Sequence, residues 1–205
     1  MIKTTKWLPF IFIIAACNNN KSADNSKSDN HADHQMVTAH DYCDSVNKGL
    51  IAEDTLKGSP HRSAMNTINN NHVHIEYNSP GVKGRTIWGG LVAYDKVWVT
   101  GAHSATSVQF SKDVEINGTK IPAGKYAFFT IPGKEKWTLV LNQNYDQHLA
   151  DEYSETEDLV RVEVVPTQHD MVQRLTYHVN KIDDTKAEIV VNWEKLQVAL
   201  PFASL

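Results

Sequence analysis

The sequence has few cysteines, no apolar run long enough to cross a membrane, and no excess of positive charge. Its two cysteines are Cys17 and Cys43, so at most one intrachain disulfide can form. The apolar stretch near the N-terminus covers residues 7–16, whereas a membrane-spanning helix needs about 20 residues. With 20 Lys and Arg against 24 Asp and Glu, the formal net charge is −4. Because an acidic chain does not attract phosphate backbones, this composition predicts no binding of nucleic acid.

Motifs of the common enzyme classes are also missing. The chain contains no G-x-S-x-G, no H-E-x-x-H, no P-loop and no dinucleotide-binding fingerprint. Ser104 follows His103 directly, and neighbouring residues of a strand point to opposite faces, so these two do not form a nucleophile and its base. The sequence therefore identifies no catalytic residue and favours a non-enzymatic binding or structural role.

The first residues have the layout of a targeting segment. Lys3 and Lys6 precede the apolar residues 7–16, which end in two alanines, and this order is typical of a secretory signal peptide. The run I-A-A-C that ends at Cys17 resembles the bacterial lipobox, in which the chain is cut before the cysteine and the thiol is acylated. Several acyl chains hold a protein to a membrane stably, whereas one holds it only marginally. We therefore expect residues 1–16 to be a signal peptide and Cys17 to carry palmitate-type lipid.

This anchor predicts a lipoprotein of the bacterial cell envelope, attached to a membrane on the periplasmic side or the outer surface. Membrane lipid is then one partner, and other envelope proteins are a second possible class of partner. If Cys17 carries lipid, Cys43 has no cysteine left to pair with, so we expect a free thiol that packs as a small apolar residue.

Three further regions follow the predicted signal peptide. Residues 17–40 contain mostly Asn, Ser, Asp, Lys and His; such a stretch buries too little apolar surface to offset its ordering entropy, which predicts a disordered tether. Residues 41–57 form a short helical lead-in, with Asp41 able to cap a helix. Residues 58–205 contain short apolar stretches separated by Pro and Gly turns, and form one domain.

This last region predicts an all-β fold. Residues 73–77 alternate strictly, which places Val73, Ile75 and Tyr77 on one face of a strand. Asn117-Gly118 lies between two apolar stretches and predicts a tight hairpin. Further strands are expected near residues 126–131, 137–141, 160–165, 175–179 and 187–193. Short strands at near-regular spacing, without long helices between them, favour an antiparallel β-sandwich, jelly-roll-like, with a short N-terminal helix and a disordered tether.

The segment from residue 59 to residue 142 resembles a known bacterial family. The resemblance rests on Y-N-S-P-G-V-K-G-R at residues 77–85, I-W-G-G-L-V at 87–92, I-P-A-G-K-Y at 121–126 and F-T-I-P-G at 129–133. These runs are similar to the family catalogued as domain of unknown function 2911, which is frequent among exported proteins of Bacteroidetes-type bacteria. The family implies a fold but no assigned activity. Around the T-G-A run its pattern prefers Arg and Asn, where this chain has Val99 and His103.

One candidate ligand surface comprises the turns around residues 77–98 and 101–106. Glycines allow backbone amides to approach a ligand, and two cations in a glycine-rich turn can hold an anion. Tryptophans can stack on sugar rings, although they more often belong to a core. The candidate residues for a small anionic or glycan ligand are Lys83, Arg85, Trp88, Trp98, His103 and Thr106. The alternative for the cations is that they pair with acids such as Glu76.

A second candidate site is a metal centre. His72 and His74 project from the same face of one predicted strand, and alternate imidazoles on a strand suit a divalent transition metal such as Zn, Cu, Fe or Ni. His103 or His148 would complete the ligand set. This pattern gives the alternative function, a metal-binding protein or metal-dependent enzyme. The opposing interpretation is a solvent-facing polar row. Within the predicted tether, His31, His34, Met36 and His40 could capture copper or zinc weakly.

Overall fold

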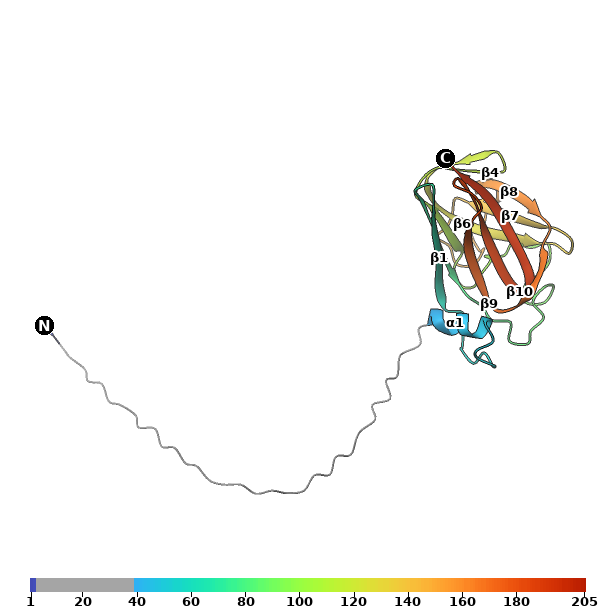
Figure 1. The fold of residues 1–205 in the computed structure, drawn as a ribbon, viewed down its shortest axis with the longest axis horizontal. Helices are drawn as coiled ribbons and strands as arrows, with labels where there is room; N and C mark the ends of the chain where they lie inside the picture. Colours follow the sequence, from blue (N-terminus) through green and yellow to red (C-terminus); the bar gives the residue numbers. More distant parts are fainter. Residues whose placement is uncertain (3–38) are drawn as a thin grey trace, which may run out of the picture. The chain divides into compact units, whose positions relative to one another are not determined.

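The computed structural model describes residues 1–2 and 39–205 (Figure 1). The chain divides into two units, residues 1–35 and 36–205, and the fold below is that of residues 39–205. Most of the predicted signal peptide, the lipidation site Cys17, and the tether with His31, His34 and Met36 lie outside the described residues, as does the side chain of His40. Among the described residues, no helix is both long and apolar enough to span a membrane.

Two antiparallel sheets form the domain, together with one short helix, α1 (Ala39–Asn47). The six-stranded sheet has the order β1 (His61–Ile68), β2 (Asn71–Asn78), β3 (Thr106–Phe110), β6 (Gly124–Pro132), β7 (Trp137–Asn142) and β8 (Asp158–Val164). The four-stranded sheet has the order β5 (Thr119–Ile121), β4 (Val114–Ile116), β10 (Lys186–Ser204) and β9 (Thr167–Lys181). A single 3-10 turn, η1 (Glu155–Glu157), precedes β8. The predicted all-β antiparallel sandwich with a short N-terminal helix is confirmed.

The alternation predicted for the strand at residues 73–77 is observed in β2. Val73, Ile75 and Tyr77 are buried in the core between the sheets, while His72 is exposed on the outer face. Burying one face of each sheet removes apolar surface from water, which is the main favourable contribution to folding such a sandwich. The predicted hairpin is also present. Asn117 and Gly118 have φ values of 50° and 76°, the left-handed conformation that a two-residue turn between β4 and β5 requires.

The helix α1 is shorter than the lead-in predicted for residues 41–57. It ends at Asn47, and Gly49 follows in the left-handed conformation with φ of 69°. A glycine in this conformation is a common C-terminal stop for a helix. Leu50 therefore lies beyond the helix and is exposed.

The strand β1 and the long extensions of β9 and β10 were not predicted. β10 runs for 19 residues, and its pairing with β9 shifts register on both sides of Glu194, which has φ of 55°. A bulge changes which face successive side chains point to. The buried side chains of β10 therefore change phase at the bulge, from Ala187, Ile189 and Val191 before it to Val198, Leu200 and Phe202 after it.

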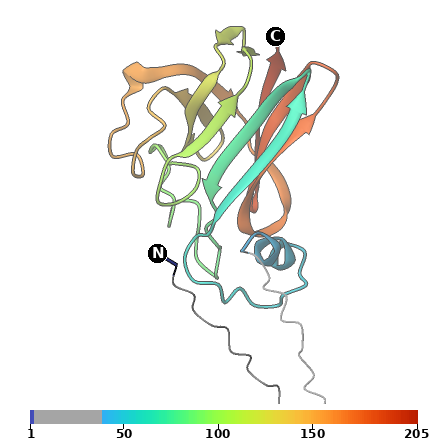
Figure 2. The ribbon, with the colours of Figure 1, turned by 90° about the vertical axis from the view of Figure 1, so that its left-hand side faces the viewer.

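The edges of the two sheets meet along one side of the sandwich, where β1 faces β9 (Figure 2). Asn66 Nδ2 of β1 donates to the Val179 carbonyl of β9 at 2.9 Å. Just after β2, the Val82 N–H donates to the Gln173 carbonyl at 2.7 Å. The helix α1 packs at one end of this seam against β9, and both ribbon views place it beneath the ends of the strands. We call this line of contact the seam.

Candidate functional site

Three of the six predicted ligand residues line one pocket. Arg85, Trp98 and His103 lie around a cavity of about 270 Å³, which we call the loop pocket because its walls come largely from the connections between β2 and β3. Its other lining residues are Ser59, Pro80, Leu91, Val92, Val99, Gly101, Ala102, Leu149 and Trp193. Three of the turns in the candidate ligand surface, those that carry Arg85, Trp98 and His103, therefore meet at one cavity.

The loop that carries His103 is held by several main-chain contacts. The carbonyl of His103 accepts the N–H of Leu149 at 2.7 Å, and the main chain of Trp98 pairs with Thr130 of β6. Trp98 Nε1 donates to the Gly101 carbonyl at 3.1 Å. His103 itself has φ of 64°, a left-handed conformation that is uncommon for a residue with a side chain. These main-chain contacts therefore fix the positions of the Trp98 and His103 side chains in the loop pocket.

The floor of the loop pocket is aromatic and its rim is partly apolar. Trp98 and Trp193 stack with their ring centroids 5.5 Å apart and their planes 22° apart. Leu91 and Leu149 are 50% and 40% exposed, and exposed leucines beside a cavity are candidates for contact with a ligand. Trp193 is buried, yet its Nε1 has no hydrogen-bond partner among the described residues. A buried indole N–H usually finds an acceptor.

Lys83, Trp88 and Thr106 do not line the loop pocket. Lys83 Nζ donates to the Leu56 carbonyl, and its side chain lines a different hollow beside α1. Thr106 is buried, and its Oγ1 donates to the Thr100 carbonyl at 3.2 Å. The acid Glu76, considered as a partner for the basic turn, instead binds Lys125 Nζ at 2.6 Å. That hydrogen bond is the main reason the pKa of Glu76 is lowered.

Trp88 belongs to a cluster of four tryptophans within the core. Its ring centroid lies 4.7 Å from that of Trp137, 5.9 Å from that of Trp98 and 5.8 Å from that of Trp193, in edge-to-face arrangements. Edge-to-face and offset stacking are the favoured geometries of aromatic pairs. Of the two tryptophans predicted to hold a ligand, Trp88 is therefore a packing residue and Trp98 serves both the cluster and the pocket.

The four predicted metal ligands are not gathered into one site. His72 and His74 lie side by side on β2, with ring centroids 6.1 Å apart. His103 and His148 lie in two loops that pair with each other, and His148 Nδ1 contacts the Asp151 carboxylate at 3.1 Å. Across residues 39–205, no three His, Cys, Asp or Glu side chains come together as a metal-binding group. Strand alternation brings the pair His72 and His74 together, but tertiary folding supplies no third ligand to it.

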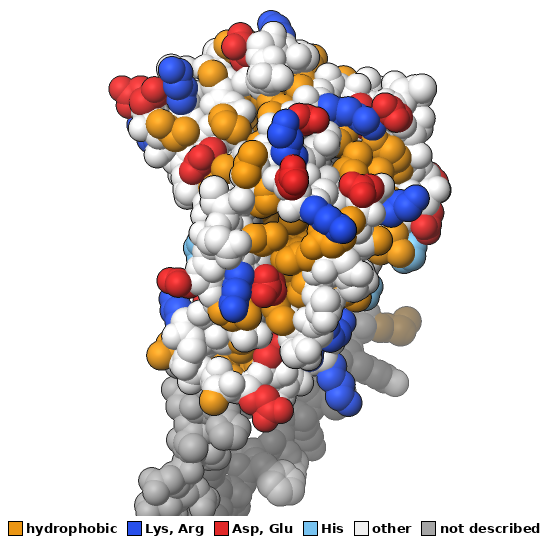
Figure 3. Space-filling view, turned by 90° about the vertical axis from the view of Figure 1, so that its right-hand side faces the viewer, with side chains coloured by type: hydrophobic (Ala, Val, Ile, Leu, Met, Phe, Trp, Pro, Cys, Tyr) orange, Lys and Arg blue, Asp and Glu red, His pale blue; other side chains and the backbone are white. Residues whose placement is uncertain are grey.

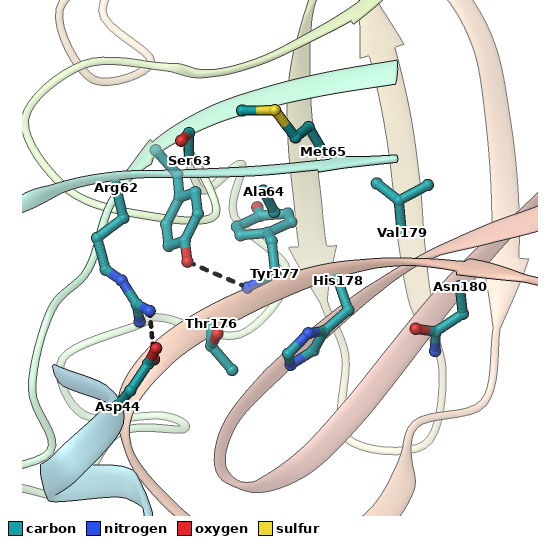
Figure 4. Close-up of a pocket in the computed structure, with 11 residues that line it drawn as sticks. Asp44, Arg62, Ser63, Ala64, Met65, Thr176, Tyr177, His178, Val179 and Asn180 are labelled. Atoms are coloured by element: carbon teal, nitrogen blue, oxygen red, sulfur yellow. Dashed lines mark hydrogen bonds and ion pairs between the residues drawn. The ribbon is translucent and has the colours of Figure 1, made fainter. Parts of the chain in front are cut away.

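A second pocket lies in the seam and was not predicted. It has a volume of about 280 Å³, and we call it the seam pocket (Figure 4). Its lining comes from α1, β1, β2 and β9: Asp44, Arg62, Ser63, Ala64, Met65, Tyr77, Thr176, Tyr177, His178, Val179 and Asn180. Only 3% of the Arg62 side chain is exposed. No local sequence signal marks Arg62 as buried, because its burial depends on β1 meeting β9.

The pKa values of several ionisable groups in and near the seam pocket are shifted by their surroundings. Burial raises the pKa of Tyr77 and, further, that of Tyr177. Partial desolvation and then the positive charge of Arg62 lower the pKa of His178. Cys43 of α1 is buried and unpaired, as expected, and burial raises the pKa of its thiol. At neutral pH the cation of the seam pocket is therefore Arg62, with a neutral imidazole beside it.

Charged side chains of both signs are interspersed on the face of the domain shown in Figure 3, with hydrophobic side chains between them. Neither sign dominates this face. This face therefore presents no broad patch of a single charge.

The fold defines the protein as an antiparallel β-sandwich domain with a loop pocket at one end of its sheets. The model of the family described as "Protein of unknown function (DUF2911)" matches residues 59–202, so the chain belongs to this family. The matched range begins just before β1 and ends within β10. No curated protein and no solved structure matches the chain.

Proposed function

We propose that this protein is a lipid-anchored binding module of the bacterial cell envelope, and that its loop pocket holds a small ligand with an apolar body and an anionic group. The observation that carries the proposal is the convergence of Arg85, Trp98 and His103 on one cavity. The sequence pattern had indicated all three residues as candidates for ligand binding, and they come from separate turns.

The lining of the loop pocket supports this ligand class. Small-molecule sites are mostly apolar, with a few polar groups that fix the orientation of the ligand. Here the stacked Trp98 and Trp193 provide a flat apolar floor, Leu91 and Leu149 extend it at the rim, and Arg85 provides a positive charge. An acceptor atom on the ligand could also satisfy the unpartnered Nε1 of Trp193.

The proposed location rests on the N-terminal sequence. Lys3 and Lys6, the apolar residues 7–16 and the run that ends at Cys17 together have the order of a lipoprotein leader. A polar stretch follows, long enough to separate a folded domain from the membrane surface. We therefore place the binding module on a membrane, in contact with the periplasm or the exterior.

A ligand panel with two single-residue variants tests the binding proposal. We expect octanoate or a related apolar carboxylate to raise the melting temperature of the full chain and to change its tryptophan fluorescence, because Trp98 and Trp193 form the pocket floor. Arg85→Ala should abolish both effects, since the guanidinium holds the carboxylate. Lys83→Ala is the matched control and should retain them, because Lys83 lines a different hollow.

Two outcomes would count against the loop pocket as the binding site. One is the absence of any stabilisation by apolar carboxylates, glycans or other anions in the panel. The other is stabilisation that Arg85→Ala leaves unchanged. Stabilisation by neutral glycans alone would keep the pocket but replace the proposed ligand class, because stacking on Trp98 would then matter more than charge.

A further inference from the structure

The second pocket, in the seam, contains a buried arginine that the loop pocket does not involve. Arg62 lies on β1, the edge strand of the six-stranded sheet, and its side chain points along the seam toward α1 (Figure 4). Its Cζ lies 5.9 Å from the centroid of the Tyr77 ring, within the range of a cation–π contact. Only 3% of the side chain is exposed, so the charge is almost fully removed from water.

The guanidinium of Arg62 is incompletely hydrogen-bonded. Its Nη2 donates to Asp44 Oδ1 of α1. Its Nε and Nη1 have no hydrogen-bond partner among the residues that the structure describes. Leaving charged N–H groups buried without an acceptor costs more than leaving neutral ones, so an acceptor from outside the chain is favoured at this position.

Arg174 of β9 provides a comparison within the same molecule. It is fully buried, with its Nε 2.6 Å from Asp54 Oδ2 and its Nη2 2.7 Å from Asp54 Oδ1. Its Nη1 donates to the Gly58 and Ser79 carbonyls at 2.8 and 3.1 Å. Each of its three nitrogens thus lies beside an oxygen of the chain, although the Nε contact with Asp54 is an ion pair without hydrogen-bond geometry. Arg62 is equally buried, yet only one of its nitrogens has a partner among the described residues.

The space next to Arg62 suits a small polar ligand with an organic part. Thr176, His178 and Asn180 of β9 line the seam pocket on the side opposite β1, and they offer hydroxyl, imidazole and amide groups. Ala64 and Val179 add apolar surface. A cavity of about 280 Å³ is large enough for a molecule of a few carbon atoms.

We propose that the seam pocket is a binding site for a small organic carboxylate, whose oxygens accept hydrogen bonds from the guanidinium of Arg62. Guanidinium and carboxylate groups match in charge and in planar geometry. Asp44 already presents one carboxylate oxygen to the same guanidinium, so this side chain of α1 competes with the ligand. The site does not depend on the loop pocket, and neither proposal requires the other.

Calorimetric and NMR titrations of the full chain with succinate and with inorganic phosphate test this site. We expect succinate to bind and to shift the imidazole signals of His178. Arg62→Met should remove binding. Asp44→Asn should tighten it by about tenfold, because this substitution removes a like charge from the site. Asn47 still joins α1 to β9 through two hydrogen bonds, so the helix should remain docked in this variant.

The gain of affinity in Asp44→Asn makes the result independent of folding defects in Arg62→Met, since a misfolded protein does not bind more tightly. Arg85→Ala is the control that separates the two pockets, and it should leave succinate binding unchanged. The proposal is overturned if succinate does not bind, if phosphate binds and succinate does not, or if Asp44→Asn weakens succinate binding.

Discussion

Two buried arginines of this domain differ in how fully their hydrogen-bonding capacity is used. Arg174 joins the loop before β1 to β9 through hydrogen bonds from Nη1 and Nη2 and an ion pair of Nε with Asp54. Arg62 has one carboxylate partner and two nitrogens without an acceptor among the described residues. Burial alone therefore does not separate a structural arginine from a binding residue. Arg62 differs from Arg174 in that its Nη1 has no partner among the described residues and its side chain lines a pocket.

At this scale we predict opposite shifts of the His178 pKa in two variants. In the native protein this pKa lies below its ordinary value of 6.5, because of partial desolvation, the charge of Arg62 and that of His169, while Asp44 acts in the opposite direction. Removing a positive charge makes the imidazolium easier to form, so Arg62→Met should raise the pKa. Removing a negative charge does the reverse, so Asp44→Asn should lower it. The titration of the His178 ring signals by NMR measures both.

Succinate should also raise the His178 pKa, since a bound carboxylate stabilises the imidazolium beside it. If neither variant moves the titration midpoint of His178, the electrostatic coupling across the seam is absent and the description of the pocket is wrong. Assignment of the ring signals by comparison with His178→Asn excludes confusion with the other histidines.

Among the larger elements, the irregular segment between α1 and β1 is fixed to β9 by an ion pair. Asp54 is 6% exposed and Arg174 is 0% exposed, and the two side chains make a two-point contact. Gly81 lies against the same pair, because a Cβ added there would be 2.6 Å from Asp54 Oδ2. The backbone approaches this pair so closely that only glycine fits at residue 81. The segment between α1 and β1 is thus held against β9.

Breaking that pair should be costly. We expect Asp54→Asn to lower the free energy of unfolding by about 3–5 kcal/mol, since it leaves the buried charge of Arg174 without its counter-ion. Denaturation in urea, followed by tryptophan fluorescence, measures the change. Asp184→Asn removes a surface pair with Lys181, in which the Asp184 side chain is 99% exposed, and should change stability little. Equal midpoints for Asp54→Asn and the unmodified chain would contradict the structural role.

For the whole molecule, the proposed anchor and the β-sandwich are separate parts of the chain. The anchor proposal concerns Cys17, whereas the described fold consists of residues 39–205 and contains Cys43 as a buried free thiol. Loss of the lipid should then change where the protein is found without changing how its domain folds.

Fractionation of cells that express single-cysteine variants tests this separation. Cys17→Ser should move the protein from the membrane fraction to the soluble fraction, with an unchanged circular dichroism spectrum and melting temperature. Cys43→Ala is the control and should remain in the membrane fraction, because the buried thiol of α1 has no part in anchoring. Membrane association that persists in Cys17→Ser would contradict a lipid anchor at this residue.

The sequence by itself determined the elements whose signals are local. Strict alternation assigned Val73, Ile75 and Tyr77 to the core face of β2, and Asn117-Gly118 located the hairpin, because both patterns depend on neighbours a few residues apart. The family was also readable from runs such as residues 77–85, and the matched range of 59–202 bears it out.

Only the tertiary structure decided which edges of the sheets meet and what is enclosed there. Asn66 and Val179, which are joined across the seam, lie 113 residues apart in the chain, and no local pattern encodes that pairing. The same closure buries Arg62 against α1 and leaves two of its nitrogens without acceptors among the residues that the structure describes. Elsewhere in the fold, Trp88 packs against Trp137 outside the loop pocket, and the predicted metal ligands form no metal-binding group within the described residues. Long-range packing, and not residue type, thus determines which of the candidate residues lie together in a pocket.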